Sequence, residues 1–339
     1  MNVFIVDEGF SGSLESKLEQ SVYKFLSEVR DAGVSLKKIF KLNVFLKTDN
    51  ESELSDIREE FSNLMKKEFS KNMPAYTIVS QPSLSGNDIL LEGVSIDEGE
   101  EIKIERRIFY KHPYVVLSSG KNDPRMIVSG GISVPGEEDL VFESQRVLDF
   151  AEQLLLKEDL DYSHIISQSN YIPSIFTVSK YGNEKLKNIQ VYDNVRSLYY
   201  STELFKDGHP ELTATGTNTG DITMDFVALS GKMPSEDGDS GNSSLLSTDM
   251  FVNSDIVTEE LSGMNTEEQT KHVLRSILQK LSVSENGDKI SYLRIYLKDK
   301  ADLPLVKSII GQNINAVNIV YLEADISNED MKIYMEAIK

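Results

Sequence analysis

The sequence predicts an α+β fold built from three tandem copies of one unit, each containing strands and two helices. One observation is that the order strand, helix, strand, helix, strand, strand occurs three times along the 339 residues. Another is that matching strands begin about 125 residues apart at each step, which is typical of an internal repeat. Residues 43–47 resemble residues 294–298, and residues 90–93 resemble residues 334–337.

The first copy is predicted to span residues 1–100. A strand at 3–6 is followed by apolar residues at helical spacing from Leu14 to Val29. In residues 40–47 the positions alternate with the period of a half-buried strand. A second helix (54–64) and strands at 75–80 and 89–96 complete the unit.

The middle copy, residues 101–232, is the longest because it has an extra hairpin that begins near 102–105. Its paired glycines indicate a bulge or a close backbone approach. The further elements are expected at these ranges: strand 126–134, helix 138–156, strand 164–173, helix 185–204, and strands 212–217 and 222–229.

Residues 233–246 are rich in Gly, Ser, Asp and Glu, a composition that predicts a flexible acidic linker. The last copy, residues 247–339, repeats the order of elements. Its ranges are strand 251–257, helix 266–281, strand 291–298, a short helix from Leu303, and strands 316–322 and 331–338.

Composition excludes several functional classes. The chain has no cysteine and four scattered histidines, so we expect no disulfide, no metal site and no bound cofactor. A net charge of −20 would repel a phosphate backbone, which argues against a nucleic-acid partner. No apolar run is long enough to cross a membrane, and the N-terminus lacks the pattern of a secretory signal. A cytoplasmic location is therefore expected.

The repeated unit resembles the RidA family, also called YjgF or endoribonuclease L-PSP. The resemblance depends on the strand 127–132, a helix with Gln145, the helix 194–200 and the segment 214–216, together with 44–47, 73–75 and 91–93 in the first copy. It implies a chorismate-mutase-like unit, a mixed sheet with two helices on one face. Three units in one chain would then form an intrachain pseudo-trimer with the sheets inward. The middle copy is also similar to the chorismatase branch.

The resemblance implies a pocket between adjacent units. In the family, an arginine after Pro-Ala binds a substrate carboxylate and a Glu on the last strand positions water. The arginine is absent here, because Tyr76, Leu212 and Val317 occupy its three positions. The acidic position is kept as Glu92, Asp225 and Glu336, which are the candidate catalytic residues. Each is alternatively a solvated residue at a strand end.

Five other residues are candidates for substrate binding. Arg196 lies on a helix with Tyr199 and offers a guanidinium for a carboxylate, although an ion pair with Asp193 or Glu203 is an alternative. A third candidate, Asn170, occupies the strand position that we match to Asn43 and Arg294. The last two, Gly130 and Gly131, either present backbone N–H groups to an anion or form a bulge.

Arg294 itself is expected to be a surface residue. The leading hypothesis is a RidA-like protein that binds a small carboxylate-bearing metabolite between its units, with imine hydrolase or chorismatase-type chemistry. The alternative is a catalytically silent binding or scaffold protein, because the substrate-binding arginine is missing. Self-association of whole chains beyond the pseudo-trimer is left open.

Overall fold

The structure is a computed structural model. It describes residues 1–120, 124–136, 139–200, 205, 211–230, 246, 251–254, 261–281, 290–314 and 318–338. The predicted linker at 233–246 lies outside these residues except for Leu246, which is buried. Val317 and the side chain of Leu212 also lie outside the described part.

The first sheet has four strands in the order β1-β4-β2-β3. They are β1 (Asn2–Val6), β2 (Ile39–Leu46), β3 (Ala75–Val79) and β4 (Ile89–Ser95). Strand β4 is antiparallel to both of its neighbours, and β2 is parallel to β3. Helices α1 (Leu14–Asp31) and α2 (Glu51–Phe69) begin at the side-chain caps Ser13 and Asn50 and bury an apolar stripe against this sheet.

The second sheet has six strands in the order β11-β8-β12-β7-β6-β5. They are β5 (Lys103–Phe109), β6 (His112–Ser118), β7 (Arg125–Ile132), β8 (Ile165–Pro173), β11 (Glu211–Thr217) and β12 (Thr223–Leu229). The predicted extra hairpin is β5 and β6. Helices α3 (Leu140–Lys157) and α4 (Asn188–Arg196) pack on one face.

The helix expected at 185–204 is wrong at its start. Residues 184–187 instead form strand β10 (Glu184–Lys187), which pairs with β9 (Val178–Tyr181) in a small hairpin. Gly182 turns this hairpin with a φ of 58°, a backbone conformation that glycine adopts at no steric cost. Helix α4 therefore begins only after the hairpin.

The third sheet has the order β13-β16-β14-β15. Its strands are β13 (Phe251–Asn253), β14 (Tyr292–Leu297), β15 (Asn318–Glu323) and β16 (Ile333–Ile338). Helices α6 (Thr266–Lys280) and α7 (Leu303–Asn313) pack on it. Asn265 and Glu268 form a capping box at the start of α6.

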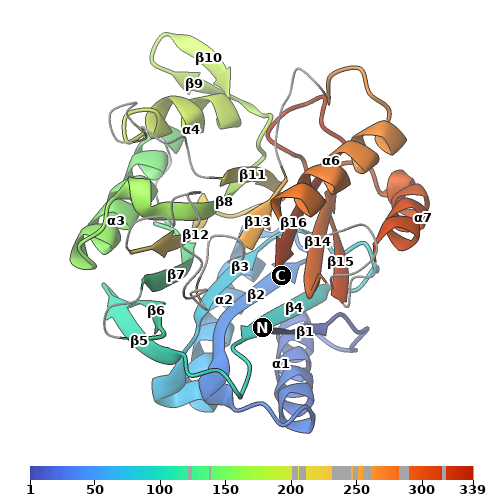
Figure 1. Ribbon diagram of the computed structural model, residues 1–339. Coiled ribbons are helices and arrows are strands. Elements are labelled where there is room, and N and C mark those ends of the chain that lie inside the picture. Colours follow the sequence, from blue (N-terminus) through green and yellow to red (C-terminus); the bar gives the residue numbers. More distant parts are fainter. Residues whose placement is uncertain are drawn as a thin grey trace, which may run out of the picture.

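The α+β class is confirmed, and one connectivity occurs in all three large sheets. The orders β1-β4-β2-β3, β7-β12-β8-β11 and β13-β16-β14-β15 are equivalent, with a parallel pair at the end of each. In Figure 1 the sheets gather at the centre and the helices lie outside them. Each sheet thus has a helix-covered face and a face toward the other sheets.

The packing follows this arrangement. Each of the three sheets has one cluster of buried side chains between it and its helices. A fourth cluster contains residues from all three sheets and lies where the sheets face one another. The half-buried strand expected at 40–47 is therefore wrong. All eight residues of β2 are buried, because one face packs on helices and the other faces the shared centre.

Two properties of the described residues bear on function. No helix within the described residues is both long enough and apolar enough to cross a membrane. Within the same part of the chain, no group of three or more His, Asp or Glu side chains is arranged to hold a metal ion.

Candidate functional site

The three acidic candidates lie at equivalent positions in the three sheets. Glu92, Asp225 and Glu336 pair in register with Asn43, Ser169 and Arg294, respectively. Each acid lies on the strand next to the parallel pair of its sheet, and its side chain faces away from the helices. All three side chains therefore point toward the region where the three sheets face one another, which we call the shared centre. Residues separated by more than 200 positions thereby meet in one place.

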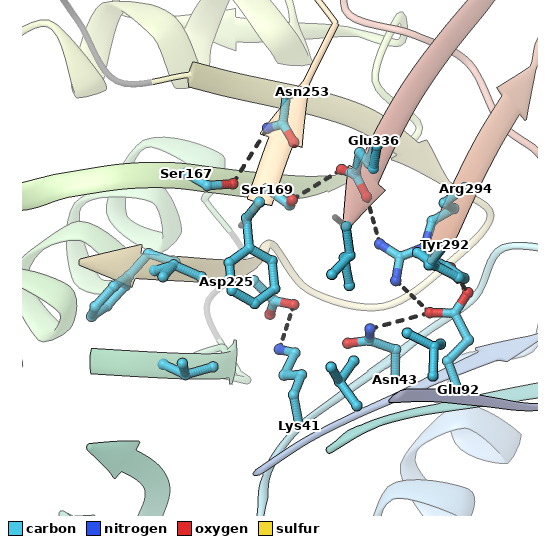
Figure 2. Close-up of a pocket in the computed structure, with 18 of the residues that line it drawn as sticks. Lys41, Asn43, Glu92, Ser167, Ser169, Asp225, Asn253, Tyr292, Arg294 and Glu336 are labelled. Carbon is cyan, nitrogen blue, oxygen red and sulfur yellow. Dashed lines mark hydrogen bonds and ion pairs between the residues drawn. The ribbon is translucent and has the colours of Figure 1, made fainter. Parts of the chain in front are cut away.

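The shared centre contains a cavity of about 80 Å³, which we call the central cavity. Its polar lining comes from all three sheets, and Figure 2 shows most of it. The polar lining residues are Lys41, Asn43, Glu92, Ser129, Ser167, Ser169, Tyr171, Asp225, Asn253, Tyr292, Arg294 and Glu336. A site that holds a water needs only about 10–15 Å³, so this cavity has room for several waters or one compact molecule.

Arg294 joins two of the acids. Its Nη1 donates to Glu336 Oε2 at 2.5 Å, and its Nη2 and Nε donate to Glu92. The Tyr292 hydroxyl also donates to Glu92 and accepts from Arg294 Nε at 2.9 Å. A planar guanidinium can bind two carboxylates at once, so Arg294 links Glu92 of the first sheet to Glu336 of the third.

Lys41 joins the third acid to the first sheet. Its Nζ lies 2.7 Å from Asp225 Oδ2 and 2.8 Å from Thr77 Oγ1. The Thr77 hydroxyl donates to Asp225 at 2.7 Å, and the Gly131 N–H donates to Asp225 Oδ1 at 2.7 Å. Asp225 is therefore held by an ammonium, a hydroxyl and a backbone amide.

Weaker polar contacts lie between the second and third sheets. The Ser169 hydroxyl donates to Glu336 Oε1 at 3.1 Å, and Asn253 Nδ2 donates to Ser167 Oγ at 3.5 Å. Asn43 Nδ2 donates to Glu92 Oε2 at 3.2 Å within the first sheet. Figure 2 shows these contacts around the cavity. The polar contacts thus link all three sheets around the central cavity.

The two cations respond differently to burial. Burial lowers the pKa of Lys41, and the attraction of Asp225 only partly offsets this. Burial also acts to lower the pKa of Arg294, but Glu92, the two neighbouring tyrosines and Glu336 together raise it well above its usual value. Arg294 is thus a permanent cation, whereas Lys41 is the cation that gives up a proton more readily.

Two buried polar atoms in the lining stay unpaired. Within the described residues, Asn43 Oδ1 and the Tyr171 hydroxyl have no hydrogen-bond partner. Figure 2 shows the Asn43 oxygen turned away from Glu92. A buried polar group without a partner costs about 1–3 kcal/mol, so these two atoms are well placed to bond to a molecule in the cavity.

Three predicted binding residues do not line the central cavity. Arg196 pairs with Asp193 at 3.0 Å, the alternative that the sequence left open, and the Tyr199 hydroxyl donates to Asp149 at 2.6 Å. Asn170 is buried on the helix side of its sheet and accepts from Tyr192. Neither Arg196 nor Tyr199 is among the cavity-lining residues.

The match of Asn170 with Asn43 is wrong by one residue. The register places Ser169, and not Asn170, opposite Asp225. Because side chains alternate along a strand, a shift of one residue moves the side chain to the opposite face of the sheet. Ser169 therefore occupies the place in the cavity that corresponds to Asn43 and Arg294.

The two glycines are adjacent to the cavity. A β-carbon at Gly130 would lie 2.0 Å from Lys41 Nζ, so glycine is needed for the lysine to fit there. The Gly131 N–H binds an anion, the carboxylate of Asp225. The register of β12 with β7 shifts beside them, as in the predicted bulge.

Sequence reasoning missed both cations. Arg294 was expected on the surface, but it is buried between two carboxylates. The alternation over residues 40–47 predicts that Lys41 lies on the solvated face of a half-buried strand, but Lys41 is buried. The available signal was Phe45, an aromatic residue on the same face as Lys41, which indicates that this face is covered as well.

His112 lies next to the central cavity, and its pKa reports how deeply this region is buried. Its Nε2 lies 2.9 Å from Ser129 Oγ and its ring packs edge-on to Phe150. Burial, followed by the charge of Lys41, lowers the pKa of His112 to about 4. The folded state therefore binds fewer protons than the unfolded state between about pH 4 and 6.5, and stability falls as the pH drops through this window.

We expect that loss to reach about 3 kcal/mol between pH 7 and 4, at about 1.4 kcal/mol per unit of pKa. The His112→Gln variant should lose less stability over the same range. Urea unfolding of both proteins at several pH values measures the difference, which isolates His112 from the carboxylates that also titrate. Parallel pH profiles would contradict the prediction.

The comparisons with known proteins bear on the fold. No model of a protein family matches the chain, nor does any curated protein. Among solved structures, a chorismatase is 14% identical with a TM-score of 0.54, covering 89% of this chain and 93% of its own. A cyanuric acid hydrolase from A. caulinodans is 7% identical with a TM-score of 0.50, covering 100% of this chain and 98% of its own.

A YjgF-family protein from Neisseria meningitidis, NMB1025, is 12% identical with a TM-score of 0.28, covering 39% of this chain and 99% of its own. The likeness to chorismatase confirms, at the level of the fold, the similarity to chorismatases that the sequence predicted. At their low sequence identities, the chorismatase and the cyanuric acid hydrolase show a shared fold and say nothing of the reaction of this chain.

Proposed function

We propose that the central cavity binds a compact, uncharged metabolite with hydrogen-bonding groups, on which the protein acts as a hydrolase-type or lyase-type enzyme. One observation carries the proposal: charged groups from three sheets meet at a buried cavity in whose wall Asn43 and Tyr171 each have an unpaired polar atom. A ligand that bonds to these atoms would remove the cost of leaving them unpaired.

The charge balance favours an uncharged ligand. The lining contains three carboxylates and two cations, so one formal negative charge is in excess. A carboxylate-bearing metabolite, the expectation from the sequence, would add a second negative charge to a buried site. Such a ligand would also compete with Glu92 and Glu336 for Arg294.

The shared fold is consistent with this proposal. Two solved structures with TM-scores of at least 0.50 are, by name, a chorismatase and a cyanuric acid hydrolase, which are enzymes that act on small molecules. Three carboxylates around a cavity supply groups that orient water or move protons. We further infer that residues 1–100, 101–232 and 247–339 are three units of a pseudo-trimer, since their sheets share one strand order.

Replacing Tyr171 with phenylalanine tests the binding site. The hydroxyl has no partner among the described residues, so its removal should stabilise the free protein by about 1 kcal/mol, or about 1–2 °C in Tm. The same change should weaken ligand binding. Thermal shift with a panel of small hydroxycarbonyl, amide and carboxylate compounds measures both effects, because a ligand that binds only the folded state raises Tm.

The matched control is Thr217→Val. Thr217 also has a buried unpaired hydroxyl within the described residues, but it does not line the central cavity. It should gain similar stability and keep the ligand response. If Tyr171→Phe leaves every ligand-induced shift unchanged, the cavity is not the binding site. Binding without turnover would favour the catalytically silent alternative, and a preference for carboxylates would restore the expectation from the sequence.

A further inference from the structure

Among the residues that line the central cavity, Lys41 is the one that carries an aliphatic amine. Its side chain is buried on β2, and its Nζ contacts Thr77 and Asp225. The absence of a side chain at Gly130 leaves the space that the amine occupies. The lysine is thus part of the cavity wall, with its amine held by two side chains and packed beneath a glycine.

Asp225 is positioned to take protons from this amine. Its carboxylate lies 2.7 Å from Lys41 Nζ, and Thr77 and the Gly131 N–H hold it in place. Arg294, the other cation, has no comparable chemistry, because a guanidinium does not lose its proton in proteins. Burial lowers the pKa of Lys41, which eases the loss of its proton.

We infer that Lys41 is a nucleophile that forms a covalent imine with a small aldehyde or ketone in the central cavity, with Asp225 as its proton acceptor and donor. The inference rests on the proposed function and specifies its substrate class. A buried lysine that exchanges its proton with a neighbouring carboxylate has the properties that imine formation requires.

The step balances as follows. Nζ of the ammonium passes a proton to Asp225 and attacks the carbonyl carbon, whose oxygen then takes that proton to give a carbinolamine. A second proton moves from Nζ by way of Asp225 to the same oxygen, and the C–O bond breaks. One water leaves, and Nζ is joined to carbon in a protonated imine. The positive charge stays beside Asp225, so the charge of the site is unchanged.

The neighbouring groups indicate the kind of carbonyl compound. Asn43 Oδ1 accepts a hydrogen bond and the Tyr171 hydroxyl can donate one, and both are unpaired within the described residues. The pKa of Tyr171 is raised well above its usual value by burial, so its hydroxyl remains a neutral donor. A short hydroxyaldehyde or hydroxyketone satisfies both atoms and adds no charge.

Reductive trapping tests the inference on the wild-type protein. The protein is incubated at pH 7 with glycolaldehyde, dihydroxyacetone or pyruvate, then treated with cyanoborohydride, digested and mapped by mass spectrometry. We expect Lys41 to be labelled severalfold faster than the exposed Lys180, because Asp225 lies 2.7 Å from the Lys41 amine and can take its proton, and because burial lowers the pKa of Lys41. Glycolaldehyde and dihydroxyacetone should label it better than pyruvate.

The controls separate this inference from the proposed function. Lys41→Arg should abolish the fast label, whereas Lys180→Arg should not. If a probe raises Tm in wild type, and less so in Tyr171→Phe, but leaves Lys41 unlabelled, the cavity binds ligands and the imine is wrong. Labelling of Lys41 no faster than Lys180 would also overturn it. Because the peptide map uses wild type, the result does not depend on the folding of a variant.

Discussion

The Arg294→Met variant is expected to lose about 3–5 kcal/mol of stability, the usual cost of removing one partner from a buried ion pair. Methionine resembles the arginine stem in length, so the lost interactions are mainly electrostatic. Glu92 and Glu336 would keep their charges in a buried site without the guanidinium that now binds both. Thermal unfolding followed by circular dichroism measures the loss.

A triple variant isolates the cause. Combining Arg294→Met with Glu92→Gln and Glu336→Gln removes the uncompensated charges, so it should recover most of the lost stability. Arg294→Lys should recover less, because one ammonium cannot present a planar fork to two carboxylates. A single variant that loses under about 1 kcal/mol would contradict the structure at this point, since that is the range of exposed ion pairs.

The Gly131→Ala variant is expected to cost about 2–5 kcal/mol. Gly131 has a φ of 68°, which costs a residue with a side chain about 1–2 kcal/mol. A β-carbon there would also lie 2.5 Å from the backbone oxygen of Tyr76, and crowding of this kind costs about 1–3 kcal/mol. Relief of the crowding would move the N–H that binds Asp225, so ligand binding should weaken as well.

Gly33→Ala is the matched control. Gly33 has nearly the same φ, 72°, but no described atom lies within 4 Å of a β-carbon built there. This variant should lose only about 1–2 kcal/mol, and the difference between the two glycines measures the crowding at Gly131. Equal losses in urea unfolding would show that the sheets do not approach each other as closely as described.

Local patterns in the sequence predicted most of the elements. Apolar spacing indicated helices α1, α2, α3 and α6, and the threefold order of elements anticipated the three equivalent sheets. The acidic positions Glu92, Asp225 and Glu336 were found by comparing the copies, and the structure brings them to one cavity. A repeat places equivalent residues at equivalent points, so this much follows from the chain alone.

The errors share a physical origin. Alternation along β2 suggested that one of its faces is solvated, yet the other two sheets cover that face and bury Lys41. Arg294 on β14 is buried for the same reason, because its side chain also lies where the three sheets meet. The match with Asn43 fell on Asn170 and missed Ser169, because strand pairing, which decides the face, is a contact between segments distant in sequence. Arg196 has a suitable chemistry, but its helix lies on the side of the sheet away from the cavity.

The sequence by itself determined most of the α+β elements, their repeated order and the positions of the three carboxylates, because these depend on periodicity and on comparison of short segments. Only the tertiary structure decided which cations meet those carboxylates. Lys41 and Asp225 are 184 positions apart, and Arg294 and Glu92 are 202 apart. Contacts at such separations arise when three sheets face one centre, and no local pattern encodes them.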